Sequence, residues 1–152
     1  MARRGIGILT MVGTLLLAAG SAWGEEGPVY APDGVAIHGY DPVAYFTEEA
    51  AVPGDPANAY EWSGATWHFA SRENLELFAQ EPEKYAPQYG GYCAWAVSRG
   101  STARIDPEQF VVEDGRLFLN FSRRINRRFV RDLQENIRSA DQNWTQVRES
   151  VD

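Results

Sequence analysis

The sequence predicts a small single domain of the α+β class, built from antiparallel β-hairpins, a short central helix and an amphipathic helix at the carboxyl end. Three observations lead to this prediction. Two pairs of apolar, β-prone runs are each joined by a glycine-containing turn, over residues 60–69 and 110–119. A helical pattern between the two pairs is interrupted by Pro82. Apolar residues then recur at helical spacing after Ser122.

The first 24 residues have the order of a secretory signal peptide. Arg3 and Arg4 precede an apolar run over residues 6–19, and small residues stand at positions 22 and 24. The run is short for a membrane-spanning helix, which needs about 20 apolar residues. We expect cleavage after Gly24 and a periplasmic or secreted protein that is not an integral membrane protein after cleavage. General secretion is favoured over twin-arginine export, and an uncleaved anchor is the alternative.

The composition of the 152 residues limits the classes of partner. Asp and Glu number 21 against 14 Lys and Arg, a formal net charge of −7. An acidic surface repels phosphate backbones, so we expect no nucleic acid as a partner. One short segment departs from this trend with five arginines. We expect a solvated helical face balanced by nearby acids, with a basic interaction face as the alternative; these residues are Arg123, Arg124, Arg127, Arg128 and Arg131.

The amino-terminal part of the mature chain predicts little regular structure. Residues 25–33 contain two prolines and no periodicity, which predicts a flexible arm. The domain itself is expected over residues 34–145. It begins with a short strand at 35–38 and a turn that leads into an aromatic, β-prone run at 40–46. Prolines and a glycine predict a loop over 48–59.

The middle of the chain predicts a hairpin followed by a helix. Residues 60–62 and 66–69 flank a short turn with Gly64, which is the pattern of a β-hairpin. Ser71 is a natural helix N-cap, and Pro82 interrupts the helix that follows.

The carboxyl-terminal part predicts a second hairpin and a long helix. The dipeptide Asp114-Gly115 fits the two left-handed positions of a type I′ turn. Ser122 is expected to cap an amphipathic helix of roughly four turns. The end of the chain is expected to fray, with residues 146–152 as a tail.

The single cysteine, Cys93, is the main candidate for chemistry. In an exported chain it has no thiol partner of its own, so it should be buried, metal-bound or paired with another molecule. If the residues after Gly91 begin a helix, the helix dipole favours the thiolate. If they form a buried strand, the apolar neighbours disfavour ionisation. The sequence leaves both conformations open.

Two histidines are available to join Cys93 as ligands. A cysteine with two neutral imidazoles is a donor set suited to copper or zinc. We therefore predict a soft-metal site, with copper as the expected ion, in which Cys93 is the thiolate ligand and His68 and His38 are optional neutral donors. For each histidine the alternative is an ordinary surface or hydrogen-bonded side chain.

Two other functions remain open, so the sequence does not decide whether the protein is an enzyme. Cys93 could be the catalytic thiol of a redox enzyme or sensor that reacts with a redox partner protein. The aromatic residues before position 96 are expected to form a core, with a pocket for an apolar or planar ligand as the alternative. The other open function is a non-catalytic interaction module whose aromatic surface binds a partner, with Cys93 as part of the core. Hydrolase and nucleotide-binding motifs are absent from the sequence.

Four blocks in fixed order give the chain a family resemblance: residues 39–46, 67–71, 82–94 and 117–120. Through these blocks the chain resembles exported YHS-domain proteins, over nearly all of the expected mature sequence.

The resemblance implies a role for the cysteine. Some relatives are selenoproteins, so Cys93 matches the thiol or selenol position and is expected to take part in redox or soft-metal chemistry. In the broader superfamily, cysteine clusters are thought to bind ions such as copper or zinc. This chain departs from that pattern, because Ala70 stands where a cysteine would be and no second cysteine follows. A complete thiolate site within the chain is therefore excluded.

Overall fold

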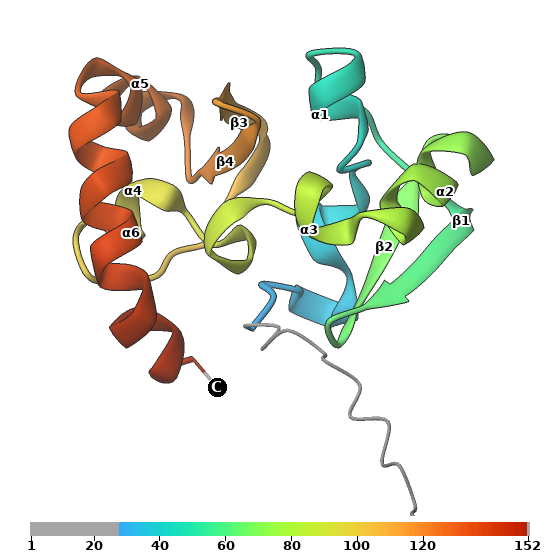
Figure 1. Cartoon of the computed structure of the whole chain (residues 1–152), viewed down its shortest axis with the longest axis horizontal. Helices are drawn as coiled ribbons and strands as arrows, with labels where there is room; N and C mark the ends of the chain where they lie inside the picture. Colours follow the sequence, from blue (N-terminus) through green and yellow to red (C-terminus); the bar gives the residue numbers. More distant parts are fainter. Residues whose placement is uncertain (1–27, 152) are drawn as a thin grey trace, which may run out of the picture.

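The computed structural model describes residues 28–151, so the predicted signal peptide lies outside the described residues. Within them the chain forms short helices and two separate two-stranded antiparallel sheets, which confirms the predicted α+β class. Figure 1 shows the first sheet with α1 and α2 on one side of the molecule, and α4, α5 and α6 on the other side of the second sheet.

The segment that precedes the first sheet differs from the prediction. Residues 35–38, expected as a strand, lie mostly in a 3-10 helix, η2 (Ala36–Gly39), which follows another, η1 (Pro32–Gly34). Ile37 and His38 both have positive φ angles, 51° and 50°, and a strand cannot contain them. Of residues 35–38, only Val35 makes a β-bridge, and its partner is Thr66. The aromatic run that follows is a short helix, α1 (Ala44–Thr47), and not a strand.

Residues 28–33, predicted as part of a flexible arm, pack on the domain. The Tyr30 amide donates to the carbonyl of Gly90 at 2.8 Å. Val29, Tyr30 and Ala31 contact the hydrophobic core. Apolar burial therefore holds the beginning of the described chain in place.

The first predicted hairpin is confirmed as β1 (Asp55–Trp62) and β2 (Ala65–Phe69). Ser63 and Gly64 turn the chain with positive φ angles. The predicted loop over 48–59 is too long, because β1 already begins at Asp55. In β2 alternate residues are buried, which is the period of two expected for a strand with one face on the core.

Four short helical elements lie between the first sheet and the second. Ser71 caps α2 (Arg72–Gln80) by accepting from the Asn74 amide at 3.1 Å, as predicted. Pro82 then separates α2 from α3 (Pro82–Tyr85). The 3-10 turn η3 (Gln88–Gly91) leads to α4 (Ala94–Ser98).

The second hairpin is also confirmed, as β3 (Asp106–Glu113) and β4 (Arg116–Asn120), with left-handed Asp114 and Gly115 at the turn. β4 separates two hydrophobic clusters. Leu117 and Leu119 belong to the cluster that contains the first hairpin, whereas Phe118 belongs to the cluster under the last helices. All three are completely buried, because both faces of β4 are covered.

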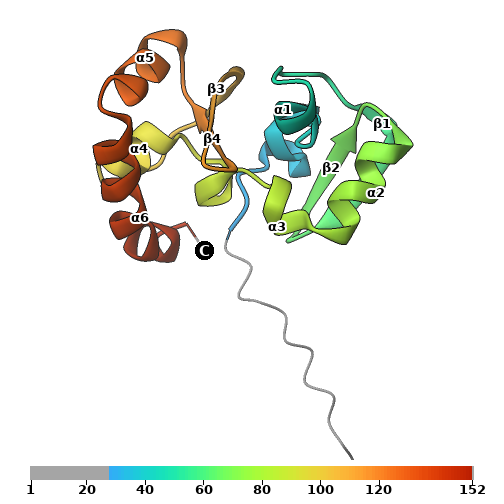
Figure 2. The same ribbon diagram turned by 45° about the horizontal axis from the view of Figure 1, so that its top comes forward.

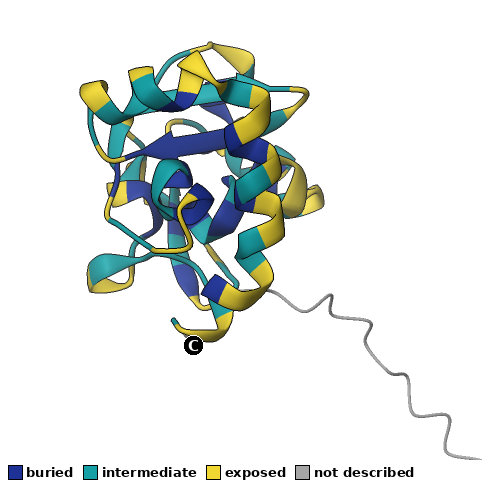
Figure 3. Ribbon diagram, turned by 90° about the vertical axis from the view of Figure 1, so that its left-hand side faces the viewer, coloured by how far each residue is buried: buried dark blue, intermediate teal, exposed yellow. Residues whose placement is uncertain are grey.

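The predicted four-turn helix at the carboxyl end is two helices. Ser122 caps α5 (Arg123–Arg131) as expected, but the chain leaves helical geometry at Asp132 and restarts as α6 (Leu133–Glu149). The predicted boundary at residue 145 falls inside α6. Figure 2 shows α5 and α6 at one end of the molecule, and Figure 3 shows exposed positions along their outer side and buried positions on the inner strands. No helix among residues 28–151 has both the length and the apolarity needed to cross a membrane.

Candidate functional site

Cys93 lies at the first turn of α4 and is buried, with 1% of its surface exposed. Its amide donates to the carbonyl of Ala103 at 3.0 Å, and its own carbonyl accepts from the amide of Val97 at 3.0 Å. Its Sγ is 3.7 Å from Oδ1 of Asn120, which is a thiol-to-amide hydrogen bond. The only cysteine is thus a packed member of the main core cluster.

Asn120 organises the polar groups around this thiol. It is completely buried. Its Oδ1 also accepts from the Trp95 amide at 3.0 Å, in the first turn of α4, and its Nδ2 donates to Oδ1 of Asn126 at 2.9 Å. Asn126 in turn donates to the carbonyl of Phe110 at 3.3 Å. Sequence reasoning missed Asn120, although an asparagine at the end of an apolar strand is a signal for a buried polar contact.

The structure shows the helical alternative for Cys93, because the residue caps α4, and it shows no strand there. The residue is nevertheless buried, which the sequence had linked to the strand. Burial raises the pKa of the thiol, and the backbone amides of Ala96, Phe121 and Trp95 lower it by a smaller amount. The net pKa is above its usual value, which keeps the sulfur protonated at neutral pH. A protonated, enclosed thiol is a poor nucleophile and a poor metal ligand.

The structure does not bring the two histidines together with Cys93. His38 is exposed in η2, with its ring 6.0 Å from that of Tyr30 in an edge-on arrangement. His68 is half-buried in β2, and its Nδ1 would lie 3.1 Å from a Cβ placed on Gly39. No group of three His, Cys, Asp or Glu side chains that could hold a metal ion occurs within residues 28–151.

Asp41 is a buried carboxylate that sequence reasoning did not single out. Its Oδ1 accepts from the amides of Val43 and Ala44, at 2.8 and 3.2 Å, and so anchors the start of α1. Its Oδ2 accepts from the amide of Ala70 and the side chain of Asn74, at 2.8 and 2.7 Å. Because these donors satisfy both oxygens, Asp41 holds α1, the end of β2 and α2 together.

A small cavity of about 110 Å³ lies between the first hairpin and α6. Three tryptophans form much of its wall: Trp62 and Trp67 from the hairpin and Trp144 from α6. The Trp67 indole N–H donates to the backbone carbonyl of Trp62 at 3.0 Å, which fixes the Trp67 ring against the backbone of β1, and the two ring centroids lie 5.7 Å apart. The remaining lining residues are Val29, Ser63, Ala86, Pro87 and Gly90.

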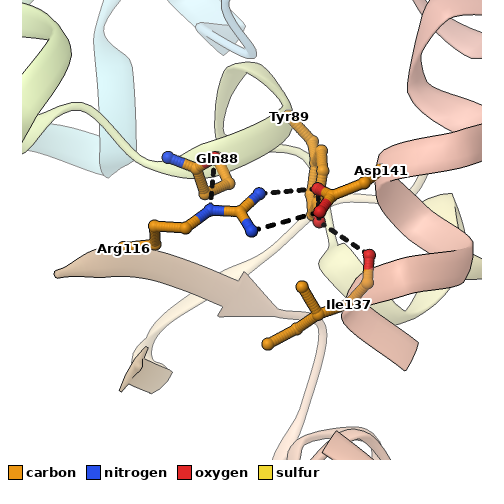
Figure 4. Close-up of polar contacts among 5 residues, drawn as sticks. All are labelled: Gln88, Tyr89, Arg116, Ile137 and Asp141. Atoms are coloured by element: carbon orange, nitrogen blue, oxygen red, sulfur yellow. Dashed lines mark hydrogen bonds and ion pairs between the residues drawn. The ribbon is translucent and has the colours of Figure 1, made fainter. Parts of the chain in front are cut away.

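A polar cluster joins η3, β4 and α6 close to this cavity. Arg116 binds Asp141 through two hydrogen bonds, of 3.1 and 2.6 Å, and donates to Oε1 of Gln88 at 3.0 Å. The Tyr89 hydroxyl donates to the same carboxylate at 2.8 Å and lies 3.5 Å from the carbonyl of Ile137 (Figure 4). Burial raises the pKa of Tyr89, and its hydrogen bond to Asp141 raises it further. The cluster therefore fixes α6, and with it Trp144, against η3.

Comparison with known proteins identifies one part of the chain. The family model for the YHS domain matches residues 43–89. These residues run from the start of α1 to η3 and include Trp62, Trp67 and His68, whereas Cys93 and His38 lie outside them.

No significant match was found among the curated proteins or among the solved structures. The matched segment contains the whole of the first hairpin, α2 and α3. On this evidence the protein is a YHS domain-containing protein.

Proposed function

We propose that the protein is a non-catalytic binding module that holds one small, planar, apolar group in the cavity formed by Trp62, Trp67 and Trp144. The observation that supports this proposal is the cavity itself, because the candidate thiol is enclosed while this aromatic site opens to the surface. Two of the three tryptophans lie within the residues that match the YHS domain.

The size and lining of the cavity define the ligand class. A volume of about 110 Å³ is close to that of an apolar cavity of roughly 150 Å³ known to take up benzene. It is far below the 300 Å³ or more of sites for larger molecules, so haem is excluded as an occupant of this cavity. No charged side chain is among its lining residues. A single aromatic ring, free or carried by a partner, fits these properties.

Calorimetric titration with phenol tests the proposal, with cyclohexanol as a non-planar ligand of the same ring size. Wild-type protein should bind phenol saturably and bind cyclohexanol more weakly. Ala86→Leu places extra methyl groups into the cavity, so phenol affinity should fall by about 10-fold or more. Ala59→Leu, on the exposed part of β1, is the matched control and should bind like wild type. Equal phenol binding by the Ala86→Leu variant would contradict the proposal.

The match to the YHS domain favours a second candidate, which is binding of a soft metal ion such as copper. Within residues 43–89 the sequence offers His68 but no cysteine or methionine as a soft donor. Cys93 would have to lose its proton and reach solvent through local opening of the core.

Titration of Cu(I) into wild type, Cys93→Ser and His68→Gln tests this candidate. Loss of affinity in both variants would support a site that uses both residues. Equal weak binding by all three proteins would eliminate it.

A redox role for Cys93 has less support than either candidate. Redox-active thiols are exposed and have a lowered pKa, whereas Cys93 is enclosed and has a raised one.

We propose a location outside the cytoplasm from the sequence of residues 1–24, which lie outside the described part of the chain. The mass of the native protein tests it, since cleavage after Gly24 gives a defined amino terminus.

A further inference from the structure

Helix α5 gathers five arginines on one face. At about 100° per residue, Arg123, Arg124, Arg127, Arg128 and Arg131 fall within an arc of about 140°. Ile125 and Phe129, which contact the two hydrophobic clusters, lie on the opposite side. All of the arginines are exposed except Arg128, which is half-buried at the edge of the arc. The packing of α5 thus leaves a continuous cationic face on the outside of the molecule.

The expected neutralising acids are mostly missing from this face. Of the five arginines only Arg131 forms an ion pair, with Asp132, within the described part of the chain. By contrast, the exposed cations Arg72, Lys84 and Arg138 elsewhere on the surface each pair with a glutamate. The α5 face therefore keeps a strong positive field on a chain whose net charge is negative.

Two exposed apolar side chains border the arginines. Among residues 28–151 the exposed large hydrophobic residues are Phe121 and Val130. Val130 lies about 20° from Arg123 on the helix, and Phe121 directly precedes the cap of α5. The guanidinium of Arg104 sits over the Phe121 ring at 5.0 Å, so a sixth arginine joins this end of the surface.

We propose that the α5 face binds the surface of a membrane that contains anionic phospholipids. Guanidinium groups form paired hydrogen bonds with phosphate, and the bordering Phe121 and Val130 can enter the region between headgroups and acyl chains. A membrane fits better than nucleic acid because its phosphates can bind the arginines while its interface also accommodates the two apolar side chains. α5 lies at one end of the molecule in Figures 1 and 2, where it can reach a flat surface.

Vesicle co-sedimentation of the full chain tests this proposal. The measurement compares phosphatidylcholine vesicles with vesicles that also contain phosphatidylglycerol, at low and raised salt. Insertion of the apolar residues 6–19 would contribute to both vesicle types, so the difference between them reports the charge-dependent part. Wild type should prefer the anionic vesicles, and raised salt should weaken that preference.

A triple variant, Arg123→Gln, Arg124→Gln and Arg127→Gln, should lower binding to anionic vesicles by about 100-fold. The matched control removes the same charge elsewhere, through Arg72→Gln, Lys84→Gln and Arg138→Gln, and should change binding by less than about 3-fold. Replacing the three α5 arginines by lysine should retain most of the preference, because the charge remains. Circular dichroism and urea unfolding check that each variant is folded.

Two outcomes overturn the proposal. One is an equal loss of anionic preference in the α5 variant and in the matched control. The other is binding of duplex DNA at the same salt without any preference for anionic vesicles, which would assign the face to nucleic acid.

Discussion

The side-chain amide of Asn74 donates a 2.7 Å hydrogen bond to the carboxylate of Asp41. Asp41 has no exposed surface, and its other donors are the backbone amides of Val43, Ala44 and Ala70. A buried carboxylate is thus held by neutral donors from three segments of the YHS-matched region. Removing the carboxylate leaves several donors unsatisfied, whereas removing Asn74 removes only one.

Asp41→Ala should therefore lower the free energy of unfolding by about 3 kcal/mol or more, and Asn74→Ala by about 1 kcal/mol. Urea unfolding at neutral pH measures both. Equal losses in the two variants would show that the backbone amides do not depend on Asp41.

Cys93 should react slowly with iodoacetamide while the protein is folded. The thiol is enclosed and its pKa is raised, so reaction has to wait for local opening. The expected rate is at least about 100-fold below that of the same thiol in urea. A matched exposed thiol, Ala59→Cys in a Cys93→Ala background, should react at the ordinary rate. Rapid labelling of native Cys93 at mildly acidic pH would instead revive the redox function.

The raised pKa of Cys93 also predicts a loss of stability at alkaline pH. The unfolded thiol ionises near 9.0, and the folded thiol only at higher pH. Below the unfolded pKa the stabilisation is complete, and it is lost as the pH rises towards the folded pKa because only the unfolded state releases the proton. Relative to Cys93→Ala, wild type should lose up to about 1.4 kcal/mol per pH unit in this range. Urea unfolding between about pH 8 and pH 10 measures the difference, and parallel curves for the two proteins would contradict it.

The ion pair between Arg116 and Asp141 should be worth about 1 kcal/mol, since its side chains are 33% and 44% exposed. A double-mutant cycle with Arg116→Ala and Asp141→Ala measures it. The cycle with Arg72→Ala and Glu76→Ala, an exposed pair on α2, is the control and should give a smaller coupling.

The coupling between Arg116 and Asp141 should also depend on pH. Burial raises the pKa of Asp141, but the hydrogen bonds from Arg116 and Tyr89 outweigh it and leave the pKa below 3.8. The stabilisation is therefore present above about pH 4 and disappears as the pH falls through the lowered pKa. A coupling that persists unchanged in strong acid would contradict this assignment.

Gly90→Ala should destabilise the protein more than Gly115→Ala. Both residues have positive φ angles, 61° and 71°, so both variants carry the same kind of backbone strain. A Cβ on Gly90 would also lie 1.9 Å from the carbonyl oxygen of Pro28, whereas one on Gly115 meets nothing within 4 Å. We expect losses of about 3 and 1 kcal/mol, respectively, in urea unfolding. A chain that begins at Ala31 should lose the difference between the two variants.

The elements predicted correctly are those whose signals are local. Asp114-Gly115 turns the second hairpin because both residues adopt left-handed angles, and Ser71 and Ser122 cap helices through their own side chains. By contrast, Ile37 and His38 have β-prone or neutral side chains but take positive φ angles. Tertiary packing sets those angles, and a propensity scale cannot register it.

The carboxyl-terminal helix, the burial of Cys93 and the tryptophan cavity also depend on tertiary packing, which local sequence patterns do not show. No proline or glycine marks the break between α5 and α6 at Asp132. Residues 146–149, which were expected to fray, stay helical because Val147 is buried in the hydrophobic cluster under the last helices. Cys93 could be identified as the notable residue, but its burial depends on β4 and α4 meeting over it. The tryptophan cavity combines residues more than 80 positions apart, which no spacing pattern reveals.

The core cluster that includes Trp67 and Phe78 also includes Cys93, Leu117 and Leu119, which lie beyond the YHS-matched residues 43–89. The matched segment is therefore not an autonomous folding unit. Excised alone, it would present one side of its hydrophobic interior to water and self-associate. A shortened version intended to keep the stability of the whole chain should retain everything from Val29 through α6.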